Sequence, residues 1–230
     1  MKLGLVIPLF NEEALVTEVV ASIHSILAAA AIEHTLVLVN NGSTDGTANM
    51  VDDLAQAENV IAIHFRENEG YGGGILAGLA WFEQHDFPDV IGWCWGDGQV
   101  SGQVLPDLFR ACAEGTPLAK VVRKERQDGL KRQVITTAYA ATTRALGIRT
   151  PDVNGCPKLM TREAFHQLQL QSGDWFLDAE AVIGAEQHGW AIANENVVML
   201  PRKAGRSKVN WRTVLEFGWN LSKWRVQSDQ

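Results

Sequence analysis

Four short apolar runs near the start of the chain, each followed by a polar turn, limit the fold more than any other feature of the sequence. The runs cover residues 3–7, 35–39, 60–64 and 90–95, and apolar residues recur at helical spacing in the segments between them. A run that is apolar throughout is typical of a parallel strand covered on both faces. The repeated order of strand, turn and helix therefore predicts an α/β fold with a mostly parallel central sheet and helices on both faces.

The turns after these strands are expected to meet at one edge, because ligands of such sheets bind at the carboxyl ends of the strands. Asn11 is predicted to cap a helix that begins at Glu12. Residues 40–47 form a polar turn after the second strand, and the glycine-rich residues 70–74 are read as a loop that opens the third helix. The fourth strand runs into a glycine-flanked turn around Asp97. Together these turns predict one crevice.

The polar residues of these turns suit a nucleotide. The amides of Asn40 and Asn41 and the carboxylate of Asp45 can read a base or a ribose. Asp97 can meet a metal on a diphosphate, because magnesium and manganese favour a few carboxylates and leave sites for phosphate oxygens. A role for Asp97 in the tight turn alone fits the spacing equally well. The glycine-rich segment 70–74 matches neither the dinucleotide fingerprint nor the P-loop.

Charge and composition exclude several classes of protein. A net charge of -7 argues against general nucleic-acid binding, which needs a basic surface. The 3 cysteines form no CxxC pair, so neither a disulfide framework nor a zinc site is expected, and a reducing compartment fits better. The first apolar run is too short for a signal peptide, and no window approaches the roughly 18 to 20 apolar residues of a membrane span. The sequence therefore predicts a cytoplasmic protein.

Eight segments of the chain resemble, in the same order, the motifs of family-2 glycosyltransferases. The later segments are similar to the dolichol-phosphate mannose synthase-like branch, whose members transfer sugars to polyprenyl phosphates. The resemblance covers nearly all of residues 3–208. The segments are residues 6–13, 39–47, 68–74, 96–99, Arg123 with Arg132, 152–158, 176–180 and 202–208.

This resemblance implies a GT-A fold, an NDP-sugar donor and a divalent cation, Mg²⁺ or Mn²⁺. It places Asp97 and Gln99 on the metal. The residues expected to bind the nucleotide are Pro8, Phe10, Glu12, Asn40, Asn41 and Gly72. The residues expected to bind phosphate groups of the donor or the acceptor are Arg123, Arg132, Arg202, Ser207 and Lys208. Arginine forks match phosphate oxygens and lysine adds a point charge; a solvated surface is the alternative for such residues.

Two departures from the family pattern remove negative charge from this site. Trp95 stands where the first aspartate of the metal motif is expected, and Asn40 and Asn41 replace an aspartate pair. We therefore expect weak cation binding, or binding only with the donor diphosphate present. A non-catalytic nucleotide-sugar-binding domain is the alternative from another class. Retention of Asp97 and of the motif at residues 202–208 argues against it.

The expected reaction is an inverting displacement at the anomeric carbon, in which the cation and basic residues stabilise the leaving nucleoside diphosphate. A polyprenyl phosphate acceptor, of the dolichyl or undecaprenyl type, is already ionised and needs no strong base. The hydroxyl of a soluble saccharide or natural product would need one, and Asp178 and Glu180 are the candidates. The abundance of basic residues in the motifs favours the lipid phosphate.

The resemblance and the composition together divide the chain at residue 208. Residues 1–208 are predicted to form a single GT-A catalytic domain, with a nucleotide-binding half at 1–100 and an acceptor-binding half at 101–208. Residues 209–230 are predicted to form an amphipathic helix rich in tryptophan. Two roles fit this helix equally: peripheral contact with the inner face of the membrane, or packing on the core or on the second subunit of a homodimer.

Overall fold

The computed structural model describes residues 1–125 and 148–200, and these residues form one seven-stranded sheet of order β3-β2-β1-β4-β6-β5-β7. The neighbours among β1 to β4 are parallel, β6 is antiparallel to both β4 and β5, and β7 is parallel to β5. The predicted α/β fold with a mostly parallel sheet is confirmed. The strands are β1 (Lys2–Leu9), β2 (Glu33–Asn41), β3 (Val60–Phe65), β4 (Val90–Trp93), β5 (Leu118–Glu125), β6 (Lys158–Thr161) and β7 (Ile192–Val198).

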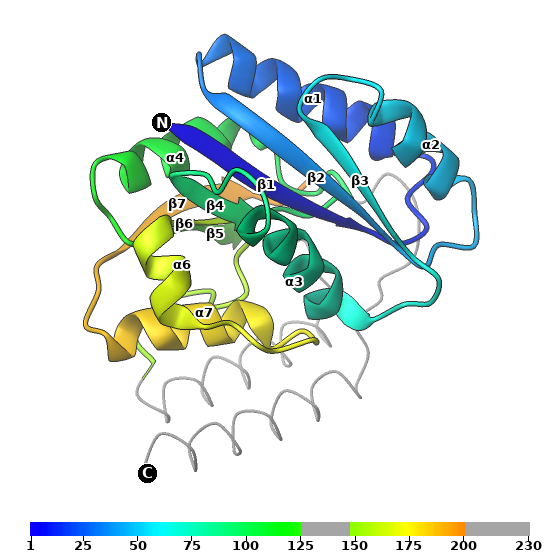
Figure 1. Cartoon of the computed structure of the whole chain (residues 1–230). Coiled ribbons are helices and arrows are strands. Elements are labelled where there is room, and N and C mark those ends of the chain that lie inside the picture. Colours follow the sequence, from blue (N-terminus) through cyan, green and yellow to red (C-terminus); the bar gives the residue numbers. More distant parts are fainter. Residues whose placement is uncertain (126–147, 201–230) are drawn as a thin grey trace.

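Helices cover both faces of the sheet (Figure 1). The helices are α1 (Val16–Ala29), α2 (Thr47–Leu54), α3 (Gly70–Glu83), α4 (Leu105–Ala113), α6 (Arg162–Leu168) and α7 (Leu177–Gln187), with a 3-10 turn, η1, at Gly102–Val104. Apolar residues of α1, α2 and α4 form a core on one face, and those of α3, α6 and α7 form a core on the other. Alternate residues of each central strand point into the two cores, and this explains why the strands are apolar throughout.

Helix α1 begins later than the sequence predicts, and its predicted cap is wrong. The helix starts at Val16, and Asn11 lies four residues before its N-cap, Leu15. Asn11 adopts a left-handed conformation with φ of 54°, and its side-chain oxygen accepts a hydrogen bond from the backbone N–H of Thr44 at 2.8 Å. Asparagine tolerates this conformation better than most residues. Asn11 therefore connects the turn after β1 to the turn after β2.

The glycine-rich segment is also different from its prediction as a loop, because Gly70 to Gly74 form the first turn of α3. The helix lies very close to β1, where a Cβ on Gly78 would meet Val6 Cγ1 at 2.4 Å. The fourth strand ends at Trp93 rather than at Trp95. Among the residues that the structure describes, no helix combines the length and the apolar character needed to span a bilayer. All three cysteines are buried and have free thiols.

Lys120 begins a segment rich in basic residues, 120–132, but its side chain is fully buried within β5. Its Nζ donates hydrogen bonds to the carbonyl oxygens of Pro151 at 2.7 Å, Asp152 at 3.1 Å and Val121 at 3.2 Å. These contacts attach residues 151 and 152 to β5. Burial, and next the nearby charge of Lys158, lower the pKa of Lys120 to about 7.

This lowered pKa predicts a rise in stability with pH. The unfolded chain holds the Lys120 proton up to a pKa of about 10.4, so between about pH 7 and 10.4 it binds more protons than the folded chain. The free energy of unfolding should therefore increase over this range, by no more than about 1.4 kcal/mol per pH unit. Urea unfolding of the wild type and Lys120→Met between pH 7 and 9.5 measures the effect. The wild type should gain stability relative to the variant as pH rises, and parallel curves would contradict the assignment.

Candidate active site

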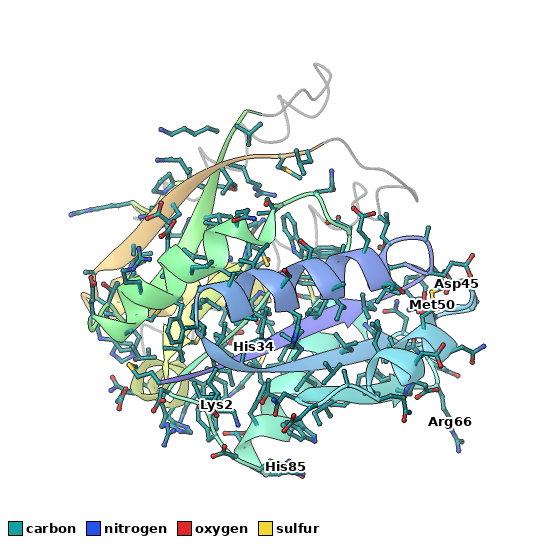
Figure 2. The ribbon with its side chains drawn as sticks, turned by 90° about the horizontal axis from the view of Figure 1, so that it is seen from above. Lys2, His34, Asp45, Met50, Arg66 and His85 are labelled. Carbon is teal, nitrogen blue, oxygen red and sulfur yellow. The ribbon has the colours of Figure 1, made fainter. Side chains whose placement is uncertain are left out.

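The carboxyl ends of β1, β2 and β4 bring their loops to one edge of the sheet, as the parallel pairing requires (Figure 1). Figure 2 shows Asp45 and Arg66, which follow β2 and β3, on the same side of the molecule and well away from Lys2 at the start of β1. The predicted nucleotide-binding residues Pro8 and Phe10 lie at the same edge as Asp45 and are half-buried. The crevice predicted from the turns therefore has its elements in the expected arrangement.

Hydrogen bonds join the turn after β1 to the turn after β2. The backbone N–H of Glu12 donates to the hydroxyl of Thr47 at 2.9 Å, and the carboxylate of Glu13 accepts from the N–H of Gly46 at 2.6 Å. Asp45 accepts from the N–H and the hydroxyl of Thr47 at 3.0 and 2.6 Å. Burial opposes ionisation of Asp45, but the hydrogen bonds from Thr47 outweigh it and lower its pKa. These hydrogen bonds join the two turns to each other and to the start of α2.

Asn40 is buried and has partners on both sides of its amide. Its oxygen accepts from the N–H of Ser43 at 3.2 Å, and its nitrogen lies 3.2 Å from Nδ1 of His64. Nε2 of His64 lies 3.0 Å from a carboxylate oxygen of Asp52. Because a carboxylate only accepts, Nε2 carries the proton and Nδ1 accepts from Asn40. Contact of Asn40 with a nucleoside stays a prediction.

The hydrogen bonds of Asn41 explain why an asparagine stands at a position where the family pattern has an aspartate. Its oxygen accepts from the N–H of Glu69 at 3.0 Å, and its nitrogen donates to the carbonyl of Gly70 at 2.7 Å. An ionised aspartate could accept the first hydrogen bond but could not donate the second. Asn41 therefore holds the start of α3 against the end of β2 with a contact that needs an amide.

Gly72 is explained by close packing of two backbones. A Cβ at this position would meet the carbonyl oxygen of Ser172 at 2.0 Å, and the N–H of Gly73 donates to the carbonyl of Gly173 at 2.9 Å. The segment before α7 thus lies directly on the first turn of α3. The predicted role of Gly72 in nucleotide binding is not needed to explain the glycine, and it stays a prediction.

Asp97 lies in a narrow turn directly after β4. Its side chain accepts a hydrogen bond from the N–H of Gln99 at 3.1 Å, and Gly98 between them has φ of 65°. The backbone of Gln99 also accepts from the N–H of Leu200 at 2.8 Å, so the turn is connected to the segment after β7. In residues 1–125 and 148–200, no group of three or more His, Cys, Asp or Glu residues could hold a metal ion. Oxygens of the donor diphosphate and water are ligands that a Mg²⁺ or Mn²⁺ ion at Asp97 can accept.

Arg123 is the predicted phosphate-binding residue that falls within the described part of the chain; Arg132, Arg202, Ser207 and Lys208 lie outside it, as do residues 209–230. Arg123 donates from Nε and Nη2 to the carboxylate of Asp152 at 2.7 and 2.5 Å. Burial alone would lower its pKa, but the contacts with Asp152 outweigh that effect and raise it. The guanidinium carbon also lies 5.2 Å from the centre of the Trp95 ring. Arg123 stays charged and is held in a fixed orientation.

Asp178, one of the two predicted bases, is 1% exposed and takes part in a buried ion pair. It accepts from Nζ of Lys158 at 2.7 Å, from the indole N–H of Trp93 at 3.1 Å and from the hydroxyl of Tyr71 at 3.1 Å. Glu180, the other predicted base, accepts from the backbone N–H of Ser172 at 2.9 Å. Both carboxylates thus have structural partners.

Sequence reasoning missed Lys158 and Tyr71 as members of this site. Lys158 is the last residue of the segment 152–158, and its neighbours in the sequence are the clearest sign of its role. It stands between Pro157 and the apolar residues Leu159 and Met160, and a lysine in such a run needs a buried partner. Tyr71 carried no comparable sign, because glycines surround it.

Comparison with known proteins places the chain in a family. Residues 5–169 match the family described as glycosyl transferase family 2. An undecaprenyl-phosphate 4-deoxy-4-formamido-L-arabinose transferase of Klebsiella pneumoniae is 29% identical over 134 residues, which are 57% of this chain. The match covers 40% of that relative, so this chain corresponds to less than half of its length.

Two solved structures share the fold. Glucosyl-3-phosphoglycerate synthase from Mycobacterium tuberculosis, in complex with phosphoglyceric acid, is 19% identical with a TM-score of 0.70, over 96% of this chain and 78% of that one. Mannosyl-3-phosphoglycerate synthase from Rubrobacter xylanophilus is 15% identical with a TM-score of 0.72, over 100% of this chain and 75% of that one. These likenesses confirm the predicted GT-A fold. The family match covers well over half of the chain, and the chain therefore belongs to glycosyltransferase family 2.

Proposed function

We propose that the chain transfers a sugar from an NDP-sugar to a polyprenyl phosphate. The observation that carries the proposal is the turn of Asp97, which follows β4 at the edge where the loops of β1 and β2 also meet. A carboxylate at the carboxyl end of a parallel strand lies where ligands of such sheets bind. Membership of glycosyltransferase family 2 supports the reaction class.

Asp97 and Gln99 would hold a divalent cation, which supplies a Lewis acid for the leaving diphosphate when it is bound. A site with one carboxylate suits Mg²⁺ or Mn²⁺, because these ions accept phosphate oxygens as further ligands. A structure of glucosyl-3-phosphoglycerate synthase from M. tuberculosis contains Mn²⁺ and uridine-diphosphate-glucose, and this supports the cation in the present fold. Arg123, with Arg132, Arg202, Ser207 and Lys208, is proposed to bind phosphate groups of the donor or the acceptor.

The engagement of both predicted bases supports a phosphate acceptor. A hydroxyl acceptor needs a base to take its proton, but Asp178 is bound to Lys158 and Glu180 is bound to backbone N–H groups. A lipid phosphate is already ionised at neutral pH and attacks without a base. The name of the Klebsiella relative points to the same acceptor class.

We propose that the reaction takes place on the cytoplasmic side of the membrane surface, where such a lipid is presented. The predicted helix at residues 209–230 would make the contact, and its alternative role in a homodimer stays open. Both roles fall outside the described residues.

The proposal is tested by adding purified full-length chain to labelled NDP-sugars with three acceptors. These are undecaprenyl phosphate, undecaprenol and 3-phosphoglycerate. Label should appear in the lipid only with undecaprenyl phosphate, because the alcohol of the same length lacks the ionised nucleophile. Transfer to undecaprenol would show that a base is present after all. Transfer to 3-phosphoglycerate alone would move the chain to a soluble acceptor.

A further inference from the structure

Trp95 stands two residues before Asp97, and its half-buried side chain is held from two sides. Its indole Nε1 donates a hydrogen bond to the hydroxyl of Tyr71 at 2.9 Å. The guanidinium carbon of Arg123 lies 5.2 Å from the ring centre, within the range of cation–π attraction. The hydrogen bond to Tyr71 thus fixes one edge of the ring, and Arg123 covers one of its faces.

A buried ion pair fixes the Tyr71 hydroxyl. This hydroxyl donates to Oδ2 of Asp178 at 3.1 Å, while Lys158 binds Oδ1 of the same carboxylate at 2.7 Å. Asp178 and Lys158 are 1% and 0% exposed, so neither can move toward solvent without losing its partner. Burial, and next the charge of Asp178, raise the pKa of Tyr71 well above its usual value. The hydroxyl thus stays protonated and remains a donor at neutral pH.

Asp152 fixes Arg123 on the other side of the indole. Two N–H groups of the guanidinium reach the two carboxylate oxygens, and the Arg123 side chain is 7% exposed. A guanidinium bound at two positions is held in one plane. Trp95 is therefore in contact with Arg123 and is joined by one residue to Asp97.

We propose that Trp95 is a positioning residue that fixes the Arg123 guanidinium and the Asp97 turn relative to each other, and that the Tyr71 hydroxyl holds it there. This inference rests on the proposed function, in which Asp97 holds the cation and Arg123 binds a phosphate group of the donor or the acceptor. An indole cannot coordinate the cation as a carboxylate would, but its flat ring aligns the guanidinium. Displacing a reacting group by about 1 Å can cost about 100-fold in rate.

Two conservative variants remove the same hydrogen bond from opposite ends. Tyr71→Phe keeps the ring, which stacks on Trp175 with centroids 4.4 Å apart, and removes only the hydroxyl. Trp95→Phe keeps an aromatic ring beside Arg123 and removes the N–H. Each variant should lower kcat about 10-fold and leave KM for the donor within about twofold. The double variant should also lose about 10-fold, because contacting residues do not act additively.

Trp190→Phe is the matched control. Trp190 stacks on His188 with ring centroids 4.6 Å apart and is not part of the contacts among Tyr71, Trp95 and Arg123. It should leave kcat unchanged. Losses that multiply in the double variant would overturn the proposal, and so would a fall in Tm with no fall in kcat. If the wild type transfers no sugar, the proposed function is wrong, and the Tm values of the variants then test whether Tyr71 and Trp95 act together. Equal Tm losses in the single and double variants would support the coupling of Tyr71 to Trp95, and additive losses would refute it.

Discussion

Asp97→Asn is expected to lower kcat/KM for sugar transfer by at least about 100-fold. The amide has nearly the shape of the carboxylate and can still accept the hydrogen bond from the N–H of Gln99, so the turn should persist. What is lost is the negative charge that holds the cation against the leaving diphosphate. Initial rates with a labelled donor and saturating Mn²⁺ measure the loss.

Asp107→Asn is the control for this variant. Asp107 lies on α4 with its side chain 53% exposed, and it pairs with Arg110 at 2.8 Å. Such a surface pair contributes little, so activity should stay within about twofold of the wild type. Equal activity of Asp97→Asn and Asp107→Asn would remove Asp97 from the proposed mechanism.

Asp178→Asn is expected to destabilise the fold by about 3–5 kcal/mol, because it leaves the ammonium of Lys158 buried without its counter-ion. The two side chains are 0% and 2% exposed, so water cannot replace the lost partner. Urea unfolding followed by circular dichroism gives the free energy of unfolding. Asp86→Asn, which breaks an ion pair between Lys2 and an Asp86 side chain that is 83% exposed, should change it by less than about 0.5 kcal/mol.

A double variant distinguishes the effect of the two charges on stability from the effect of side-chain packing. Lys158→Met with Asp178→Leu removes both charges, so it should be less destabilised than Asp178→Asn alone. If the free energy of unfolding of Asp178→Asn lies within about 1 kcal/mol of the wild-type value, the ion pair does not have the strength that its burial implies.

The first four strands could be predicted from the sequence, whereas three later ones could not. Strands β1 to β4 are apolar because helices cover both faces. Strand β5 reads as a basic segment because Lys120 and Arg123 interrupt it, although Lys120 is buried by its contacts with backbone carbonyls. Strand β6 has 4 residues and begins at a lysine, and no position of β7 is fully buried. No local pattern distinguishes such strands from loops.

The candidate site likewise contains residues that could be proposed from the sequence and contacts that could not. Asp97 could be proposed from the segment at residues 96–99, and Arg123 from its similarity to an arginine of the related branch. The contact between Lys158 and Asp178 joins residues 20 apart, and that between Tyr71 and Trp95 joins residues 24 apart. Such pairs exist only once α3 and α7 pack on the sheet. The sequence also carried no sign that the amide of Asn41 bonds the backbone at the start of α3. Its predicted contact with a nucleotide stays a prediction.

Donor binding tests the central claim, that Asp97 holds the cation of an NDP-sugar, most directly. The measurement is the Tm of the wild type and Asp97→Asn with UDP-, GDP- and dTDP-sugars, each with and without Mn²⁺. A ligand that binds the folded state stabilises it by about 2.7 kcal/mol at 100 times its Kd. We predict that one donor raises the Tm of the wild type only with Mn²⁺, and that Asp97→Asn loses this rise. An equal rise without Mn²⁺, or in Asp97→Asn, would contradict the account, as would no rise with any donor.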